Sequence, residues 1–185
     1  WMSFKGCSGL KSLVIPASLT SISYTAFELC EGIETIEVDK DNPVYDSRNN
    51  CNAIIETASN TLVRGSNNTV IPDNITTIGD DAFHGSNIES IIVPESVTKI
   101  NGHAFEYCRK MTSISLPESI KEIEYMVFLG CESLKSIMIP QSVTSIGFCT
   151  FYGCKSFNTV VIPDGVKILD QQAFYECEGL TSVTI

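Results

Sequence analysis

A repeat of 23 residues constrains the fold of this chain more than any other feature of its sequence. Proline and phenylalanine both advance in that step and in one register. The residues concerned are Pro94, Pro117, Pro140 and Pro163, and Phe105, Phe128, Phe151 and Phe174. Two unrelated residue types that share a register identify a true repeat. Short repeats stack along one axis and contact only their neighbours, so we predict a single solenoid domain over residues 1–185, with about eight partial or complete turns.

The turn from Leu134 to Cys154 shows what one repeat contains. Ile137 and Ile139 alternate as in a short strand, and Pro140 ends that strand because proline has no N–H to donate. Each turn is therefore expected to contribute one strand to a parallel sheet. In the later segment Ala-Phe-x-x-Cys, phenylalanine and cysteine lie three residues apart and would share one face of a helix. This spacing predicts a single α-turn or 3-10 turn in each repeat.

The repeat is interrupted between Val38 and Pro72, where the chain carries extra polar residues. Within this insert, which covers about residues 39–65, the runs 53–56 and 61–64 have the composition of strands and are joined by four residues. A connection of that length is typical of a β-hairpin. We predict a hairpin that either projects from the third turn or replaces part of it.

The charge of the chain excludes some classes of partner. The chain contains 12 Lys and Arg residues and 22 Asp and Glu residues, so its formal net charge is -10. Such a field repels phosphate backbones and anionic lipid heads, and no apolar run approaches the roughly 18 residues of a membrane helix. We expect neither nucleic-acid binding nor membrane insertion. Both ends fall inside the repeat without a polar cap, so a fragment of a longer protein is expected, with signal and anchor elsewhere.

The consensus Leu-x-x-Ile-x-Ile-Pro-x-Ser-Val-Thr-x-Ile-Gly-x-x-Ala-Phe-x-x-Cys resembles the BspA-like leucine-rich repeats of bacterial surface proteins, particularly those of the Bacteroides type. The resemblance covers nearly the whole chain, with small departures at Val127, Thr150 and Ser86. It implies a secreted or surface-attached protein that binds host proteins or other cells, with no catalytic residues. The expected fold is an α/β solenoid. Its features would be a right-handed superhelix, a parallel sheet on the concave face, short helical or 3-10 turns on the other side, and one hairpin insert.

The sequence offers few residues for chemistry. Six cysteines share one repeat position, namely Cys7, Cys30, Cys108, Cys131, Cys154 and Cys177. Stacked side chains point the same way, so buried free thiols are favoured over disulfides or zinc. Cys51 and Cys149 lie outside this column and are the only candidates for separate thiol chemistry.

Two other groups could suggest a site. His84 and His103 have no triad-like neighbours in sequence and are interpreted as exposed loop residues. The acidic loop from Asp39 to Asp46 lacks the glycine and the distant glutamate of a calcium loop, and turn formation explains it better. The sequence therefore predicts no catalytic, cofactor or metal residues and no enzyme activity.

The outward face of the strands is the most informative surface. Alternation places one column of mainly hydroxyl residues beside a largely apolar column. The expected binding face, called the sheet face below, comprises Val14, Glu37, Val70, Ser90, Ile92, Ser113, Ser115, Ser136, Met138, Thr159 and Val161. Serine and threonine also simply suit a packed sheet, but soluble monomers usually avoid a row of exposed apolar residues unless it binds something.

Two functions follow from these features. The first is a non-enzymatic adhesion module, extracellular or at the cell surface, that binds a protein ligand from host extracellular matrix or from another cell. The alternative is a structural spacer that holds another domain away from the surface. An appended catalytic or carbohydrate-binding domain in the complete gene would favour the spacer.

Overall fold

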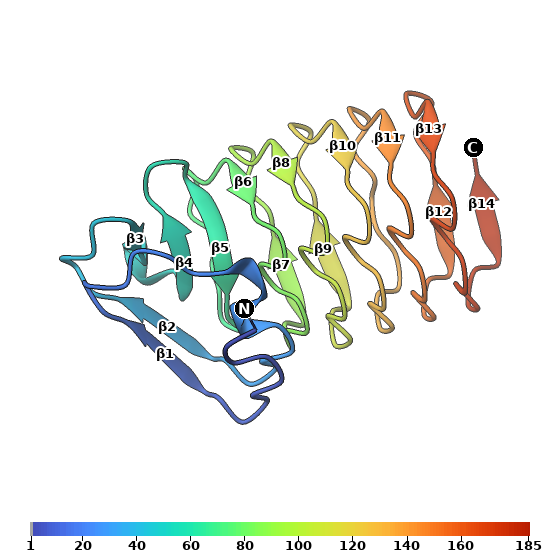
Figure 1. The fold of residues 1–185 in the computed structure, drawn as a ribbon. Helices are drawn as coiled ribbons and strands as arrows, with labels where there is room; N and C mark the ends of the chain where they lie inside the picture. Colours follow the sequence, from blue (N-terminus) through green and yellow to red (C-terminus); the bar gives the residue numbers. More distant parts are fainter. Residues whose placement is uncertain (1) are drawn as a thin grey trace.

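The computed structural model describes residues 2–185 as a β-solenoid of stacked coils with little helix (Figure 1). The strands before the repeated proline form the first side of the coils. Three parallel pairs occur there: β1 (Ser12–Ile15) with β2 (Thr35–Val38), β7 (Ser90–Ile92) with β9 (Ser113–Ser115), and β12 (Thr159–Val161) with β14 (Ser182–Thr184). Ile91 lies opposite Ile114, one repeat later, so the predicted register is confirmed.

The prediction that every turn adds a strand to one continuous sheet is wrong. Residues 68–70 and 136–138 form no strand, and the first side consists of three separate two-stranded pieces. The side-chain pattern nevertheless persists there, because Ile137 is 7% exposed and Met138 is 84% exposed. Inward packing, rather than a regular hydrogen-bond ladder, therefore maintains the register in these coils.

Short strands after the proline form a second side of the coils. These are β6 (Thr77–Ile78), β8 (Lys99–Ile100), β10 (Glu122–Ile123), β11 (Ser145–Ile146) and β13 (Ile168–Leu169). They belong to two parallel groups, β6 with β8 and β10 with β11 and β13, and Figure 1 shows all five in a row along one edge of the stack. Ile78, Ile100, Ile123 and Ile146 are completely buried, so β6, β8, β10 and β11 each contribute an isoleucine to the core, whereas both residues of β13 are exposed.

The insert contains the predicted hairpin. β4 (Ala53–Glu56) pairs antiparallel with β5 (Thr61–Gly65). β3 (Tyr45–Asp46) pairs antiparallel with the other edge of β4, and a loop that includes the 3-10 helix η2 (Arg48–Asn50) connects β3 to β4. β5 then pairs in parallel with β6, with Leu62 opposite Ile78. The hairpin therefore replaces the second-side strand of the third turn, which decides between the two alternatives raised by the sequence.

The α/β class is not confirmed. The segment Tyr24–Phe27 forms a 3-10 helix, η1, but the equivalent segments in the other coils are turns, and residues 2–185 contain no α-helix. The cause is hydrogen bonding between coils: Phe83 N–H donates to Ala104 O, Phe105 N–H to Val127 O and Phe128 N–H to Thr150 O. These bonds fix each phenylalanine against the next coil. Within a coil only short turns close, such as those from Cys108 N–H to Phe105 O and from Glu106 N–H to His103 O.

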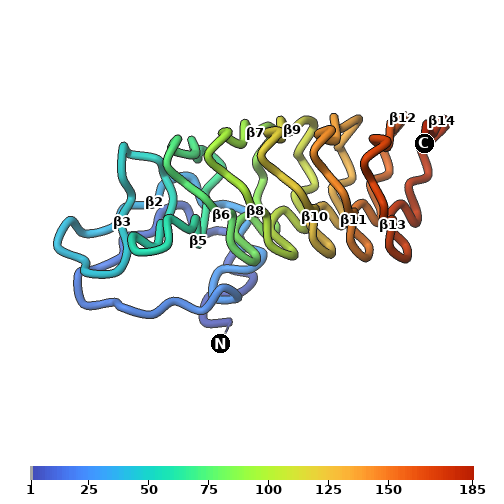
Figure 2. Tube along the Cα trace, turned by 90° about the horizontal axis from the view of Figure 1, so that it is seen from above, coloured from blue at the N-terminus to red at the C-terminus, as the bar shows by residue number. Residues whose placement is uncertain are grey.

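The core divides into two clusters at the insert. A large cluster extends from Cys51 to Cys177, and a small one contains Leu13, Phe27 and neighbouring residues as far as Ile54. The coils that carry β1 and β2 lie at a visible angle to the rest of the stack (Figures 1 and 2). Residues 2–185 include no helix with the length and apolar character needed to cross a membrane. The handedness of the superhelix stays a prediction.

Candidate functional site

The sheet face is solvent-exposed along its whole length. All eleven of its residues, Val14, Glu37, Val70, Ser90, Ile92, Ser113, Ser115, Ser136, Met138, Thr159 and Val161, are exposed. Its apolar members are well exposed, with Val70 at 74% and Ile92 at 76%. Inward residues such as Ile91 are buried because alternate side chains of a strand point to opposite faces.

Shallow hollows lie between neighbouring coils on this face. One of about 420 Å³ is lined by Val70, Ile92 and Pro94, and another of about 410 Å³ by Met138, Val161 and Pro163. Glu37 is the one charged residue among those of the sheet face, so the net acidity of the chain lies largely elsewhere. The surface offers apolar hollows flanked by hydroxyl groups, which suits an apolar or aromatic side chain of a protein ligand better than a charged small molecule.

The six cysteines of the repeat position stack as predicted, and all eight cysteines of the chain are free. Each buried thiol in the column donates a hydrogen bond to the phenylalanine carbonyl of the coil that precedes it in the stack. Cys131 Sγ lies 3.2 Å from Phe105 O, and Cys154 Sγ lies 3.3 Å from Phe128 O. Burial raises the pKa of Cys108 to about 12 and that of Cys177 to about 11. These thiols are structural groups that resist ionisation.

The raised thiol pKa values predict a loss of stability at alkaline pH. The thiol of Cys108 ionises in the unfolded chain near its ordinary pKa of 9.0, but only near pH 12 in the folded chain. Unfolding therefore releases a proton between these values, and the free energy of unfolding should fall by about 1.4 kcal/mol per pH unit for this thiol. Denaturant titrations between pH 8 and 11 would measure the slope. The Cys108→Ala variant should show a shallower slope, and an equal slope in both proteins would contradict the prediction.

The two cysteines outside the column resemble those within it. Cys51 and Cys149 are buried, and burial raises the pKa of each thiol. Cys149 Sγ contacts the side-chain oxygen of Gln172 at 3.2 Å.

In the acidic loop, the side-chain oxygen of Asn42 accepts hydrogen bonds from the N–H groups of Val44 and Tyr45. These bonds stabilise a turn, as interpreted from the sequence.

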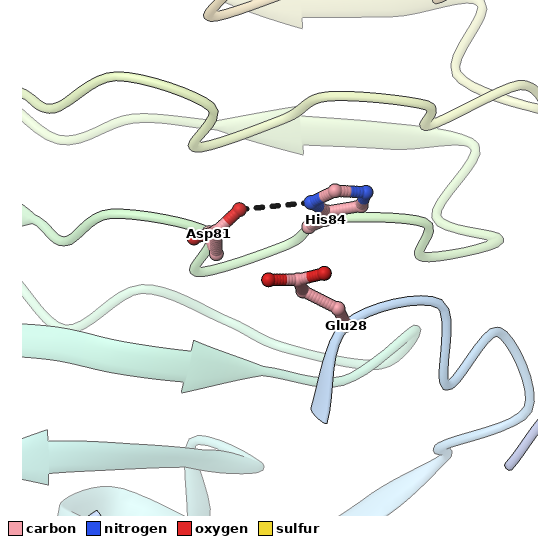
Figure 3. Close-up of side chains that lie close together, drawn as sticks. All are labelled: Glu28, Asp81 and His84. Carbon is pink, nitrogen blue, oxygen red and sulfur yellow. Dashed lines mark hydrogen bonds and ion pairs between the residues drawn. The ribbon is translucent and has the colours of Figure 1, made fainter. Parts of the chain in front are cut away.

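The histidines differ from their predicted placement. His84 is 7% exposed rather than an exposed loop residue, and its Nδ1 lies 2.8 Å from Asp81 Oδ1. Glu28 reaches the same space from the coil of η1 (Figure 3). The ligand atoms of Glu28, Asp81 and His84 all lie within 4.8 Å of one another, as do those of Asp81, His103 and Glu106. We call these five residues the His/carboxylate cluster.

The repeat contained a signal for this cluster. The position after the repeated phenylalanine is occupied in successive stacked turns by Lys5, Glu28, His84 and Glu106. Equivalent positions of neighbouring coils lie about 5 Å apart, so these side chains form a ladder of ionisable groups. Each of these residues, taken alone, has the character of an exposed polar residue, and only the stacking of the coils brings them together. Glu28 and His84 also become neighbours only because the hairpin replaces part of the turn between them.

The cluster lies in a partly enclosed pocket beside a buried cation. The pocket has a volume of about 460 Å³, and its remaining lining residues are Tyr24, Thr25, Asp80 and Tyr125. Lys5 forms an ion pair with Glu28, and a hydrogen bond with Glu106 raises the pKa of His103. The fully buried Arg64 donates from Nη1 to the carbonyl oxygens of Asp81 and His84, both at 3.2 Å.

Comparison with known proteins agrees with this geometry. The sequence profile of the BspA type leucine-rich repeat region matches residues 2–62 and 57–181, with six copies. A leucine-rich cell surface protein from Faecalibacterium prausnitzii is 30% identical, with a TM-score of 0.82 over 95% of this chain and 48% of its own length. The leucine-rich repeat protein of T. pallidum is 29% identical, with a TM-score of 0.62 over 80% of this chain and 70% of its own.

A more distant structure and the curated proteins complete the comparison. A leucine-rich repeat protein from Bacteroides ovatus shares the fold at 24% identity and a TM-score of 0.53. Among curated protein sequences, none matches this chain. The chain spans about half the length of the Faecalibacterium protein, 48%.

Proposed function

This chain belongs to the BspA type leucine-rich repeat family, and we propose that it is a non-enzymatic binding module that holds a protein ligand on its sheet face at the cell surface. The observation that carries the proposal is a set of exposed apolar side chains at one repeat position. Glu37 and Ser115 interrupt this series, whose apolar members are Val14, Val70, Ile92, Met138 and Val161. The likeness to a bacterial cell surface protein supports the location. We expect this face to lie on the concave side of a right-handed superhelix.

The chemistry of the sheet face favours a protein over other partners. Its hollows are open and lined mainly by apolar residues, although Asp73 borders the one beside Ile92. The hydroxyl groups of Ser90, Ser113 and Ser136 can donate or accept hydrogen bonds beside them. A polypeptide lying across the coils can place apolar side chains in the hollows and pair its polar groups with this ladder. We propose that the ligand comes from host extracellular matrix or from another cell surface.

The double variant Ile92→Asp, Met138→Asp is expected to reduce capture of a protein ligand by at least tenfold, because each carboxylate would lose its hydration in an apolar interface. Purified matrix proteins immobilised on a sensor surface would provide the measurement, with the wild-type chain as reference. Both side chains are more than three-quarters exposed, at 76% and 84%, so the fold should tolerate the change.

A matched control is available on the second side of the stack. Ile168 is 59% exposed in β13, outside the sheet face, so Ile168→Asp adds the same charge elsewhere. This variant should bind like the wild type. Equal capture by the double variant and the wild type would exclude the sheet face as the binding site.

The alternative function, a spacer, rests on the continuous core of the stack. The large core cluster runs without interruption from Cys51 to Cys177, as expected of a stiff support. Under this proposal the sheet face would bind nothing, and the complete gene would encode a further catalytic or carbohydrate-binding domain. Binding of a matrix protein that is lost in the double variant would decide against it.

A further inference from the structure

We propose that Glu28, Asp81 and His84 bind a divalent transition-metal ion of the Zn²⁺ type and thereby connect the N-terminal coils to the rest of the stack. Glu28 belongs to the coil of η1, on the N-terminal side of the insert, whereas Asp81 and His84 belong to the coil after it. Figure 3 shows the three side chains converging on one space from these two segments. The site is independent of the sheet face.

The distances suit an ion with small movements of the side chains. The three ligand atoms lie within 4.8 Å of one another, with 2.8 Å between His84 Nδ1 and Asp81 Oδ1. Ligands of a tetrahedral zinc ion with bonds of about 2.0–2.2 Å lie roughly 3.4 Å apart. The hydrogen bond would open by a fraction of an ångström, and Glu28 would approach. Water would occupy the remaining position.

The side chains are already withdrawn from solvent. Glu28, Asp81 and His84 are 6%, 6% and 7% exposed, and Glu106 beside them is 7% exposed. Three nearly buried carboxylates in one pocket require compensating positive charge, because a buried charge is costly unless it is paired. The fully buried Arg64, which donates to the carbonyl oxygens of Asp81 and His84, supplies one such charge. The ammonium group of Lys5, on a partly exposed side chain, supplies a second.

A dication can take the place of the Lys5 ammonium. When Lys5 turns to solvent, the carboxylates of Glu28, Asp81 and Glu106 outnumber the one buried cation, Arg64, and a divalent ion would offset this excess of negative charge. Lys5 is able to leave because its side chain is 38% exposed, whereas that of Glu28 is only 7% exposed. The lysine therefore competes with the metal for Glu28, and its removal should strengthen metal binding.

The donor set selects the type of ion. Imidazole nitrogen together with carboxylate oxygens suits zinc and its neighbours, whereas Ca²⁺ and Mg²⁺ prefer oxygen donors alone. Glu106 and His103 form a second possible donor set with the same Asp81. We assign the ion to the first set because only that set joins the two sides of the insert, where the core is divided.

Metal binding should be measured on chelator-treated, desalted protein in the Cys7→Ser background, because Cys7 has an exposed thiol that could bind zinc by itself. Calorimetry with Zn²⁺ is expected to give one site per chain, and Zn²⁺ but not Mg²⁺ or Ca²⁺ should raise the midpoint of thermal unfolding. With Co²⁺ as a spectroscopic probe, visible bands without a thiolate charge-transfer band are expected, since no cysteine is a ligand.

Four variants make the assignment specific. Glu28→Gln and His84→Gln should each weaken zinc binding by more than about tenfold, while His103→Gln should bind like the parent protein. Lys5→Met should bind zinc more tightly than the parent, an outcome that a merely destabilising substitution would not produce. Circular dichroism of each apo variant verifies that it is folded.

Several results would overturn the proposal. These are the absence of a stoichiometric zinc site in the parent protein, a thiolate band with Co²⁺, and loss of binding in His103→Gln with retention in His84→Gln. The outcome is separate from the proposed function, because the sheet-face variant Ile92→Asp, Met138→Asp leaves all three ligands intact and should bind zinc normally.

Discussion

Replacing Phe128 by alanine is expected to lower the free energy of unfolding by roughly 3–5 kcal/mol. Phe128 is completely buried and stacks between Phe105 and Phe151, with ring centroids 5.6 and 5.4 Å away. The substitution would leave a cavity at the contact between two pairs of coils. In a repeat array such a loss falls on the nearest-neighbour interfaces, so the two halves of the stack should unfold separately.

Denaturant unfolding followed by tyrosine fluorescence and by circular dichroism would measure this effect. Two non-coincident transitions, or one transition at a clearly lower midpoint, are expected. Phe148→Ala is a matched control, since Phe148 is only partly buried and lies outside the phenylalanine stack; its cost should be well below that of Phe128→Ala. An unchanged, coincident transition in Phe128→Ala would contradict the assigned core register.

The Arg64→Ala variant should lose roughly 3–5 kcal/mol of stability, the range observed when one partner is removed from a buried ionic arrangement. Arg64 is among the largest fully buried side chains. Its loss would leave the carbonyl groups of Asp81 and His84 without their donor and the carboxylates of Glu28 and Asp81 without a nearby buried cation. Chemical denaturation at neutral pH would give the difference.

Two further variants separate charge from general packing effects. Arg109→Ala removes an arginine whose side chain is 48% exposed, and it should lower the free energy of unfolding by no more than about 1 kcal/mol. Arg64→Lys keeps the charge but cannot reproduce the planar fork of donors, so an intermediate loss is expected. If Arg64→Ala costs no more than Arg109→Ala, the buried guanidinium does not stabilise the junction.

The repeat in the sequence predicted the parts of the fold that depend on side-chain periodicity. The inward position of Ile91, the outward position of Ile92 and the burial of Phe128 follow directly from the register. The hairpin was also predicted, and β5 extends one residue further than expected, to Gly65. These features are local in sequence or recur at a fixed step, so a single chain contains enough information to infer them.

Features that depend on contacts between coils could not be inferred in the same way. The sequence predicts a single α-turn or 3-10 turn in each Ala-Phe-x-x-Cys segment. One segment forms a 3-10 helix, but in the other coils the N–H groups of residues such as Phe105 bond to the next coil. The approach of Glu28 to His84 depends on how the hairpin replaces a strand of the third turn, which no periodic pattern specifies. The face residues were placed correctly on the surface, and their role in binding stays a proposal.

The hairpin also limits the registers in which the coils can pair. Coils of nearly the same sequence could pair out of step by one repeat, within a chain or between two chains, at little cost in apolar contacts. A shifted pairing would deprive β5 of β6 and would bury the guanidinium of Arg64 away from the carbonyl groups of Asp81 and His84. The irregular third turn therefore makes one coil unique, and any pairing that is out of register by one repeat is less stable than the native one.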